Sequence, residues 1–270
     1  MDCKLPEDFH TVLQIENASE RFDEALQVAE KISAADVKLY PNMDHAAIFT
    51  DPPCLVAGPL KKMGYVAGWD TKCYPSPVDE QDYINVPSGL PVGHPALARG
   101  WFHYVAVVHP VDQPALDQML GQGYGNPFIH HLTWGIVPPD RNGGDDFDYA
   151  CRVISHMVNT RQRIGGYLNQ EPGTLIMALP PDITQHPRFE TTLPELLDGL
   201  DTDSYQVETM QGGGFLIQFF VLTGGRIEVA LRINTRQTFN PKSVHKISED
   251  ANRRIDELRP ATPSQCERHS

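Results

Sequence analysis

The sequence has no run of basic residues, and acidic side chains clearly outnumber basic ones. Lys and Arg together number 22 against 35 Asp and Glu, which gives a net charge of −13. Binding to nucleic acid or to an anionic membrane surface needs clustered Lys and Arg. The charge therefore argues against both kinds of partner, and we expect a small-molecule substrate instead. The sequence leaves the oligomeric state open, a homodimer included.

Long apolar runs and paired cysteines are also lacking. The longest apolar runs have the length of a strand, so no membrane span is expected. The N-terminal residues lack the charged start and apolar core of a signal peptide. The five cysteines are widely spaced and form no CxxC pair, so neither a disulfide framework nor a thiolate zinc site is indicated. These absences predict a reducing compartment, and we expect a cytoplasmic protein.

Two common catalytic motifs are missing as well. The Gly-rich stretch at 121–127 lacks the Lys-Ser/Thr of a phosphate loop and does not follow a strand. No Gly-x-Ser-x-Gly elbow is present. The search for chemistry therefore turns to histidines and carboxylates.

The segment 213–234 predicts a β-hairpin with a turn at Gly224-Gly225, because adjacent glycines between apolar runs favour a two-residue turn. This turn predicts a register in which Val221 faces Glu228 and Ile217 faces Arg232. Side chains alternate between the two faces of a strand. One predicted face is mostly apolar and should belong to the core. It carries Leu216, Phe220, Leu222, Ile227, Val229, Leu231 and Ile233.

The other face of this hairpin mixes apolar and charged residues. Ile217, Phe219 and Val221 would lie beside Glu228 and Arg232. Buried charges need partners, so one interpretation is a cavity wall with a carboxylate and a guanidinium directed into it. The other is an amphipathic surface with an ion pair between the two charged groups. The sequence does not decide between them.

The pattern along the whole chain predicts an α+β protein in two halves, 1–121 and 122–260, with a disordered tail at 261–270. The first half would contain a strand at 9–15, a helix at 19–32, a Pro- and Gly-rich excursion at 51–99, a strand at 101–108 and a helix at 114–120. The second half would contain a strand at 128–137, a helix from Phe147 through Arg161, strands at 174–178 and 205–209, the hairpin, and a final helix at 244–258.

The strand at 128–137 carries two adjacent histidines that should point to opposite faces. His131 would share a face with Thr133 and Gly135, and His130 would lie on the other face. This strand, together with the strand that contains Glu228, resembles a βαβββ module of the vicinal oxygen chelate superfamily, the group of glyoxalases, extradiol dioxygenases and bleomycin-resistance proteins. The resemblance is clearest over residues 128–234.

In that superfamily, a His in the first strand and a Glu in the last strand commonly ligate a divalent metal. The resemblance therefore implies that His131 and Glu228 are metal ligands. The first half would be a diverged copy with His10 on its opening strand and His103 on its closing strand, where the family usually has Glu. The implied fold is two βαβββ modules whose curved mixed sheets enclose a metal-containing cavity, with His103, His131 and Glu228 as ligands and His10 as a fourth.

Two or three imidazoles with one carboxylate suit Fe(II), Mn(II), Ni(II) or Zn(II). Our first expectation is a non-haem Fe(II) dioxygenase that acts on a small keto, hydroxy or phenolic substrate chelated by the metal. The alternatives are a glyoxalase-type lyase or isomerase that uses the metal as a Lewis acid, and a metal-free protein that binds a small ligand. Arg232 would clamp a substrate carboxylate or form an ion pair within the protein. Thr133 and Gln14 would line the same cavity.

Overall fold

The computed structural model describes residues 13–15, 17–51, 54–67, 72–75, 82–90, 93–98, 102, 104–110, 113–209, 215–222 and 228–234. Over these residues the protein combines helices with a mixed sheet, which confirms the predicted α+β class. No helix within these ranges is long and apolar enough to span a membrane.

Ten strands of the described residues form one sheet. They are β1 Leu39–Phe49, β2 Val66–Ala67, β3 Lys72–Pro75, β4 Asp82–Gly89, β5 Tyr104–Pro110, β6 Phe128–Ile136, β7 Leu175–Leu179, β8 Tyr205–Thr209, β9 Leu216–Leu222 and β10 Glu228–Asn234. Their order is β2-β4-β5-β1-β6-β10-β9-β7-β8, and β3 pairs with β4. The first five strands and the last five therefore occupy separate halves of the sheet.

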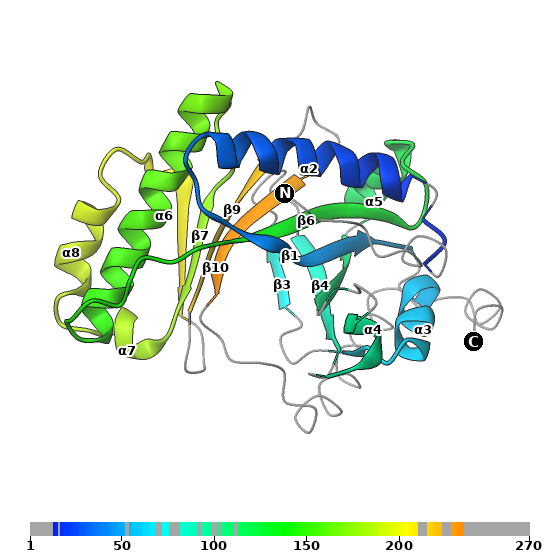
Figure 1. Ribbon diagram of the computed structural model, residues 1–270, viewed down its shortest axis with the longest axis horizontal. Coiled ribbons are helices and arrows are strands. Elements are labelled where there is room, and N and C mark those ends of the chain that lie inside the picture. The colour runs from blue at the N-terminus through cyan, green and yellow to red at the C-terminus, as the bar shows by residue number, and fades with distance from the viewer. Residues whose placement is uncertain are drawn as a thin grey trace.

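The helices of the described residues are α2 Ala18–Ala34, α3 Cys54–Lys62, α4 Pro95–Ala98, α5 Gln113–Gly121, α6 Asp146–Leu168, α7 Pro181–Thr184 and α8 Phe189–Leu196, with a 3-10 turn η1 at Thr202–Ser204. The helices expected at 19–32, 114–120 and 147–161 are confirmed as α2, α5 and α6. Figure 1 shows α2 lying along β6, and α6 packed over the β7–β9 side of the sheet.

The two halves of the sheet repeat one arrangement. In each half the first strand lies parallel to the last, β1 with β5 and β6 with β10. The strand before the last then pairs antiparallel to it, β4 with β5 and β9 with β10. The two first strands, β1 and β6, pair antiparallel at the centre and join the halves. The segment 51–99 supplies α3, α4 and the strands β2 to β4 of this arrangement.

The opening strand of the first half is not where the sequence pattern placed it. Leu13 is helical, and Gln14 lies in a turn with φ of 55°, so the described end of the expected strand at 9–15 is not extended. The first strand is β1 instead, and α2 precedes it rather than following the opening strand. His10 lies outside the described residues.

The register of the β9–β10 hairpin differs from the prediction by one residue. Glu228 pairs with Leu222, Ala230 with Phe220, and Arg232 with Gln218. An odd number of residues, 223–227, separates the paired ends, whereas a two-residue turn needs an even number. A shift of one residue exchanges the faces of a strand. Ile217, Phe219 and Val221 accordingly lie in the hydrophobic core and not in a cavity wall beside Glu228.

The sheet has two different faces. The larger core lies between the sheet and α2, α3 and α6, and it receives Ile48, Ile129 and Trp134 from the central strands. A smaller cluster lies on the opposite face, where Leu116 and Met119 of α5 pack against Phe49 and Phe128. His45, Ala47 and Phe49 alternate along β1 with core residues, so these three share the second face. This face carries the candidate site.

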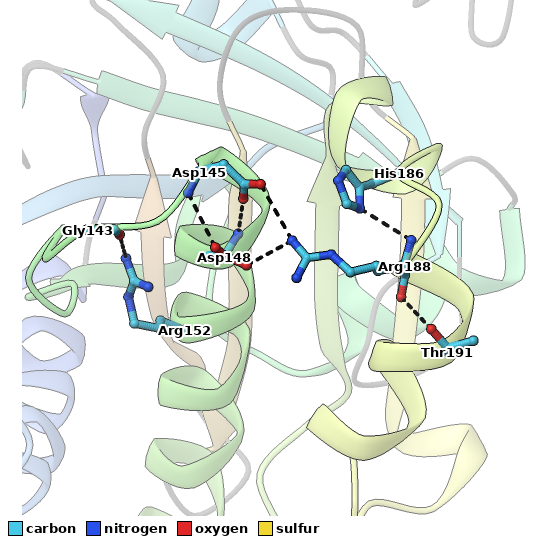
Figure 2. A network of polar contacts seen from close by, with 7 residues as sticks. All are labelled: Gly143, Asp145, Asp148, Arg152, His186, Arg188 and Thr191. Atoms are coloured by element: carbon cyan, nitrogen blue, oxygen red, sulfur yellow. Dashed lines mark hydrogen bonds and ion pairs between the residues drawn. The ribbon is translucent and has the colours of Figure 1, made fainter.

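The start of α6 is fixed by a capping box. The Asp145 carboxylate accepts from the Asp148 backbone N–H at 2.8 Å, and the Asp148 carboxylate accepts from the Asp145 backbone N–H at 3.4 Å. Arg188, from the turn before α8, reaches both carboxylates, at 3.5 Å from Asp145 and 2.9 Å from Asp148 (Figure 2). This network ties α8 to the first turn of α6.

The network predicts a pH-dependent contribution to stability. The hydrogen bond from Arg188, together with that from the Asp145 amide, lowers the pKa of Asp148. A carboxyl with a lowered pKa in the folded state contributes stability above its unfolded value of 3.8, and this contribution is lost as the pH falls through the folded value. We expect Arg188→Met to lower the melting temperature slightly at pH 7, and the difference from the wild type to shrink as the pH falls below 3.8 and through the lower folded pKa of Asp148. Melting curves from pH 7 to pH 2 measure this, and a difference independent of pH would contradict it.

Candidate metal site

Two buried histidines lie near the centre of the sheet, one from each half. In the β1–β6 pair, Ala46 lies opposite Leu132; one residue to either side, His45 lies opposite Thr133, and His131 lies opposite Ala47. The two histidines are thus placed symmetrically about the middle of the pair. Their ring centroids are 5.6 Å apart with the planes at 78°. Their exposed fractions are 5% for His45 and 7% for His131.

Both ring nitrogens of His45 have a polar neighbour. Nδ1 lies 2.7 Å from Asp44 Oδ2, and Nε2 lies 3.1 Å from Thr133 Oγ1. A carboxylate only accepts, so Nδ1 carries the proton and donates to Asp44. In the neutral ring, Nε2 then accepts from the hydroxyl of Thr133, which is fully buried. The lone pair of Nε2 is therefore directed into the protein interior.

His131 contacts its own neighbour in sequence. Its Nδ1 lies 2.9 Å from Nδ1 of His130, and its ring is 5.1 Å from that of Phe220. One of the two Nδ1 atoms donates and the other accepts. The expectation that His130 points simply to the opposite face is wrong, because the register of β6 shifts at this residue. Ala47 pairs with His131 while Ile48 pairs with Ile129, so His130 is the extra residue of a β-bulge.

The strands on either side of the two histidines add two further residues by register. Glu228 of β10 is the partner of His131, and Tyr104 of β5 is the partner of His45. The Tyr104 ring lies 4.7 Å from that of His45. Tyr104 therefore occupies in the first half the register position that Glu228 occupies in the second. The resemblance described above had implied His103 for this position, and His103 lies outside the described residues.

Three other residues were predicted to line the site, namely Thr133, Gln14 and Arg232. Thr133 lies beside His45, on the same face as His131, as expected. Gln14 is exposed in the turn before α2, and no described contact joins its side chain to the cluster. The backbone of Arg232 pairs with Gln218 and Gly135 rather than with Ile217, and its side chain is not described. Sequence reasoning missed Asp44 and His45, because 39–45 has no strand pattern. It missed Tyr104, because it gave the corresponding position on the strand at 101–108 to His103.

The described side chains contain no group of three His, Cys, Asp or Glu that could hold a metal ion. The side chains of His10, His103 and Glu228 do not belong to that set, so the predicted ligand set stays a prediction. A cavity of about 460 Å³ is lined by residues of α6 and by the loops at 171–172 and 199–204, among them Arg161, Glu171 and Asp201. None of the candidate site residues lines this cavity, so it is not part of the proposed metal site.

No protein-family model matches the chain, and no curated protein matches it. Among solved structures, a methylmalonyl-CoA epimerase from Mycobacterium tuberculosis is similar with 13% identity and a TM-score of 0.34, over 72% of this chain and 89% of that one. A xylose isomerase-like TIM barrel/4-hydroxyphenylpyruvate dioxygenase fusion protein is similar with 10% identity and a TM-score of 0.30, over 80% of this chain and 30% of that one. At these TM-scores neither likeness carries a functional argument.

Proposed function

We propose that this protein is a metal-dependent enzyme whose divalent metal binds at His45, His131 and Glu228. The metal would chelate two neighbouring oxygens of a small keto, hydroxy or phenolic substrate. One observation carries the proposal: the central strand pair places two buried imidazoles 5.6 Å apart, and Glu228 is the register partner of one of them. His45 takes the place that the sequence had given to His10 and His103, which remain candidates outside the described residues.

The polar neighbours of the two rings fit a metal site. Histidines that bind a metal through one nitrogen usually have the other held by a carboxylate or a second polar group. Nδ1 of His45 is held by Asp44, and Nδ1 of His131 is held by His130. Nε2 would therefore be the ligating nitrogen in both rings: Nδ1 of His131 would donate to His130, and at His45 the metal would take the lone pair of Nε2 that otherwise accepts from Thr133. Metal–nitrogen distances of about 2.0–2.1 Å are compatible with two rings at this separation.

Two imidazoles and one carboxylate suit non-haem Fe(II), which leaves coordination positions open for substrate and O₂. An Fe(II) dioxygenase is accordingly our first candidate, and Mn(II), Ni(II) and Zn(II) fit the same donors. Within the site, the Thr133 hydroxyl lies next to His45 Nε2, and the rings of Phe220 and Tyr104 pack against His131 and His45. Thr133 would orient the substrate, the two rings would exclude water from it, and Arg232 would bind a substrate carboxylate.

The second candidate is a lyase or isomerase of the glyoxalase kind, in which the metal acts only as a Lewis acid. Such a reaction needs a group that moves a proton beside the metal. Tyr104 favours this candidate, because its phenol side chain occupies the register position related to Glu228. The ring centroids of Tyr104 and His45 are 4.7 Å apart. A metal-free binding protein would use the same face but would not need the histidines.

Elemental analysis of protein purified under anaerobic conditions tests the proposal. We expect a stoichiometric divalent metal, and O₂ uptake when catechols or 2-keto acids are supplied to the Fe(II)-loaded protein. The metal-free alternative predicts that the purified protein contains no metal and gains none on incubation with Fe(II), Mn(II), Ni(II) or Zn(II). That result would overturn the proposed function.

A further inference from the structure

The bulge at His130 lies directly before the candidate ligand His131 in β6. The ladder between β1 and β6 advances by two residues on β6, from Ile129 to His131, for one residue on β1. A bulge leaves backbone groups unpaired and turns the side chain of the extra residue. Here it turns His130 toward His131, so that their Nδ1 atoms approach to 2.9 Å. The bulge therefore brings His130 within hydrogen-bonding distance of His131.

A buried arginine from α2 binds the backbone at this bulge. Nε of Arg21 donates to the carbonyl oxygen of Ile129 at 2.6 Å, across 108 residues of sequence. The guanidinium also lies over the rings of Tyr124, at 4.3 Å, and Phe128, at 5.1 Å. Arg21 is only 4% exposed. A charge-assisted bond to a carbonyl in such surroundings is stronger than a neutral one, and it holds Ile129 at the start of the bulge.

We propose that Arg21 is a positioning residue for the metal site, acting through the bulge at His130. The inference rests on the proposed function, because the orientation of the His131 ring matters here for metal binding. Metal binding through Nε2 needs Nδ1 of His131 to donate and Nδ1 of His130 to accept, and their contact would favour that tautomer and orientation of His131. Arg21 would maintain that contact by binding the carbonyl of Ile129.

The test compares two arginine variants that lose the same kind of bond. Arg21→Met keeps the apolar stem and removes the donor to Ile129. Arg161→Met is the matched control, because Arg161 is also buried, at 3% exposure, and its Nε also donates to a backbone carbonyl, that of Gly173, at 2.9 Å. A purely structural role predicts the same kind of outcome for both, a lower melting temperature with no change in the site, although Arg161→Met also loses bonds to Glu171 and Pro172.

Two measurements separate positioning from structure. The first is the ring ¹⁵N–¹H spectrum of His131 in the metal-free protein at fixed pH, which reports the tautomer. The second is the dissociation constant for Zn(II), from competition with a chelating dye. We expect Arg21→Met to change the His131 ring signals and to weaken Zn(II) binding about 10–100-fold. Arg161→Met should leave the signals in place and the affinity within about twofold, because the bonds of Arg161 go to residues 171–173 and not to the bulge.

Unchanged His131 signals in Arg21→Met, with a loss of melting temperature like that of Arg161→Met, would overturn the inference. If the wild type binds no metal ion, the proposed function fails, and the ring spectra still decide whether Arg21 positions His131. Should Arg21→Met not fold, Arg21→Lys is measured in the same way. It keeps the charge but cannot place a donor where Nε lies, so altered His131 signals support the inference and unaltered ones refute it.

Discussion

Replacement of His131 by alanine is expected to remove the bound metal and leave the fold in place. His131 projects from a central strand toward His45 and Phe220, and the variant loses one of the few protein ligands of the proposed site. The metal affinity of this variant should fall further than it does on loss of a group that only hydrogen-bonds to a ligand, which typically costs about 10–100-fold. Metal content by elemental analysis and the far-UV circular dichroism spectrum measure the two expectations. Full occupancy in this variant would remove His131 from the site.

His45→Ala and Glu228→Ala should have the same effect on metal content, since each removes one proposed ligand. His109→Ala is the matched control. His109 is also a buried histidine, and its Nε2 lies 2.9 Å from Asp51 Oδ1, much as His45 is held by Asp44. Its loss should lower stability and leave the metal bound. If His103→Ala releases the metal while His45→Ala retains it, the original assignment from sequence is right and the exchange for His45 is wrong.

The second half of the protein was largely predictable because its local signals agree with its tertiary structure. The helix α6 has a capping box at Asp145 and apolar residues at helical spacing. In β6, Leu132 and Trp134 belong to the core while Thr133 faces the site, as alternation requires. The pairing of His131 with Glu228 then follows from placing the first strand of the half beside the last.

The opening strand of the first half was not predictable from local pattern. β1 contains Pro41, Asn42 and Asp44, all poor strand residues. It is held in the sheet because it pairs with β5 on one side and β6 on the other. Residues 9–15, by contrast, show clean alternation, yet their described end is not extended. Tertiary pairing overrides local preference here, and for this reason His45 was missed as a candidate ligand.

The error in the hairpin has a simpler cause. Gly224-Gly225 suggested a two-residue turn, but the pairing of Leu222 with Glu228 leaves five residues between the paired ends. One extra residue in a connection is invisible to apolar pattern, and it exchanges the faces of one strand relative to the other. The register of Glu228 beside His131 depends on β6 and not on the turn, whereas the predicted cavity wall of Ile217, Phe219 and Val221 depended on the turn and was wrong.

The dependence of turnover on metal and oxygen separates the two catalytic candidates. Zinc has no accessible redox step, so a dioxygenase at this site should consume O₂ with Fe(II) and fall to the background rate with Zn(II) or under argon. A lyase or isomerase needs only a Lewis acid and should keep its activity in both cases. Replacement by Zn(II) removes the redox-active metal, and argon removes the co-substrate O₂.

The experiment loads the metal-free protein with Fe(II) or Zn(II) and supplies catechols, 2-keto acids or hemithioacetals, with O₂ uptake and substrate loss followed together. The His131→Ala variant serves as the blank for metal-independent reaction. Substrate loss with Zn(II) under argon, absent in that variant, would end the dioxygenase proposal and establish the Lewis-acid alternative. Tyr104→Phe then becomes the informative variant, because its ring keeps the packing against His45 while it loses the hydroxyl. Under the Lewis-acid alternative it should slow turnover by about 10²–10⁴-fold, the usual contribution of a proton-transfer group, and leave metal content unchanged.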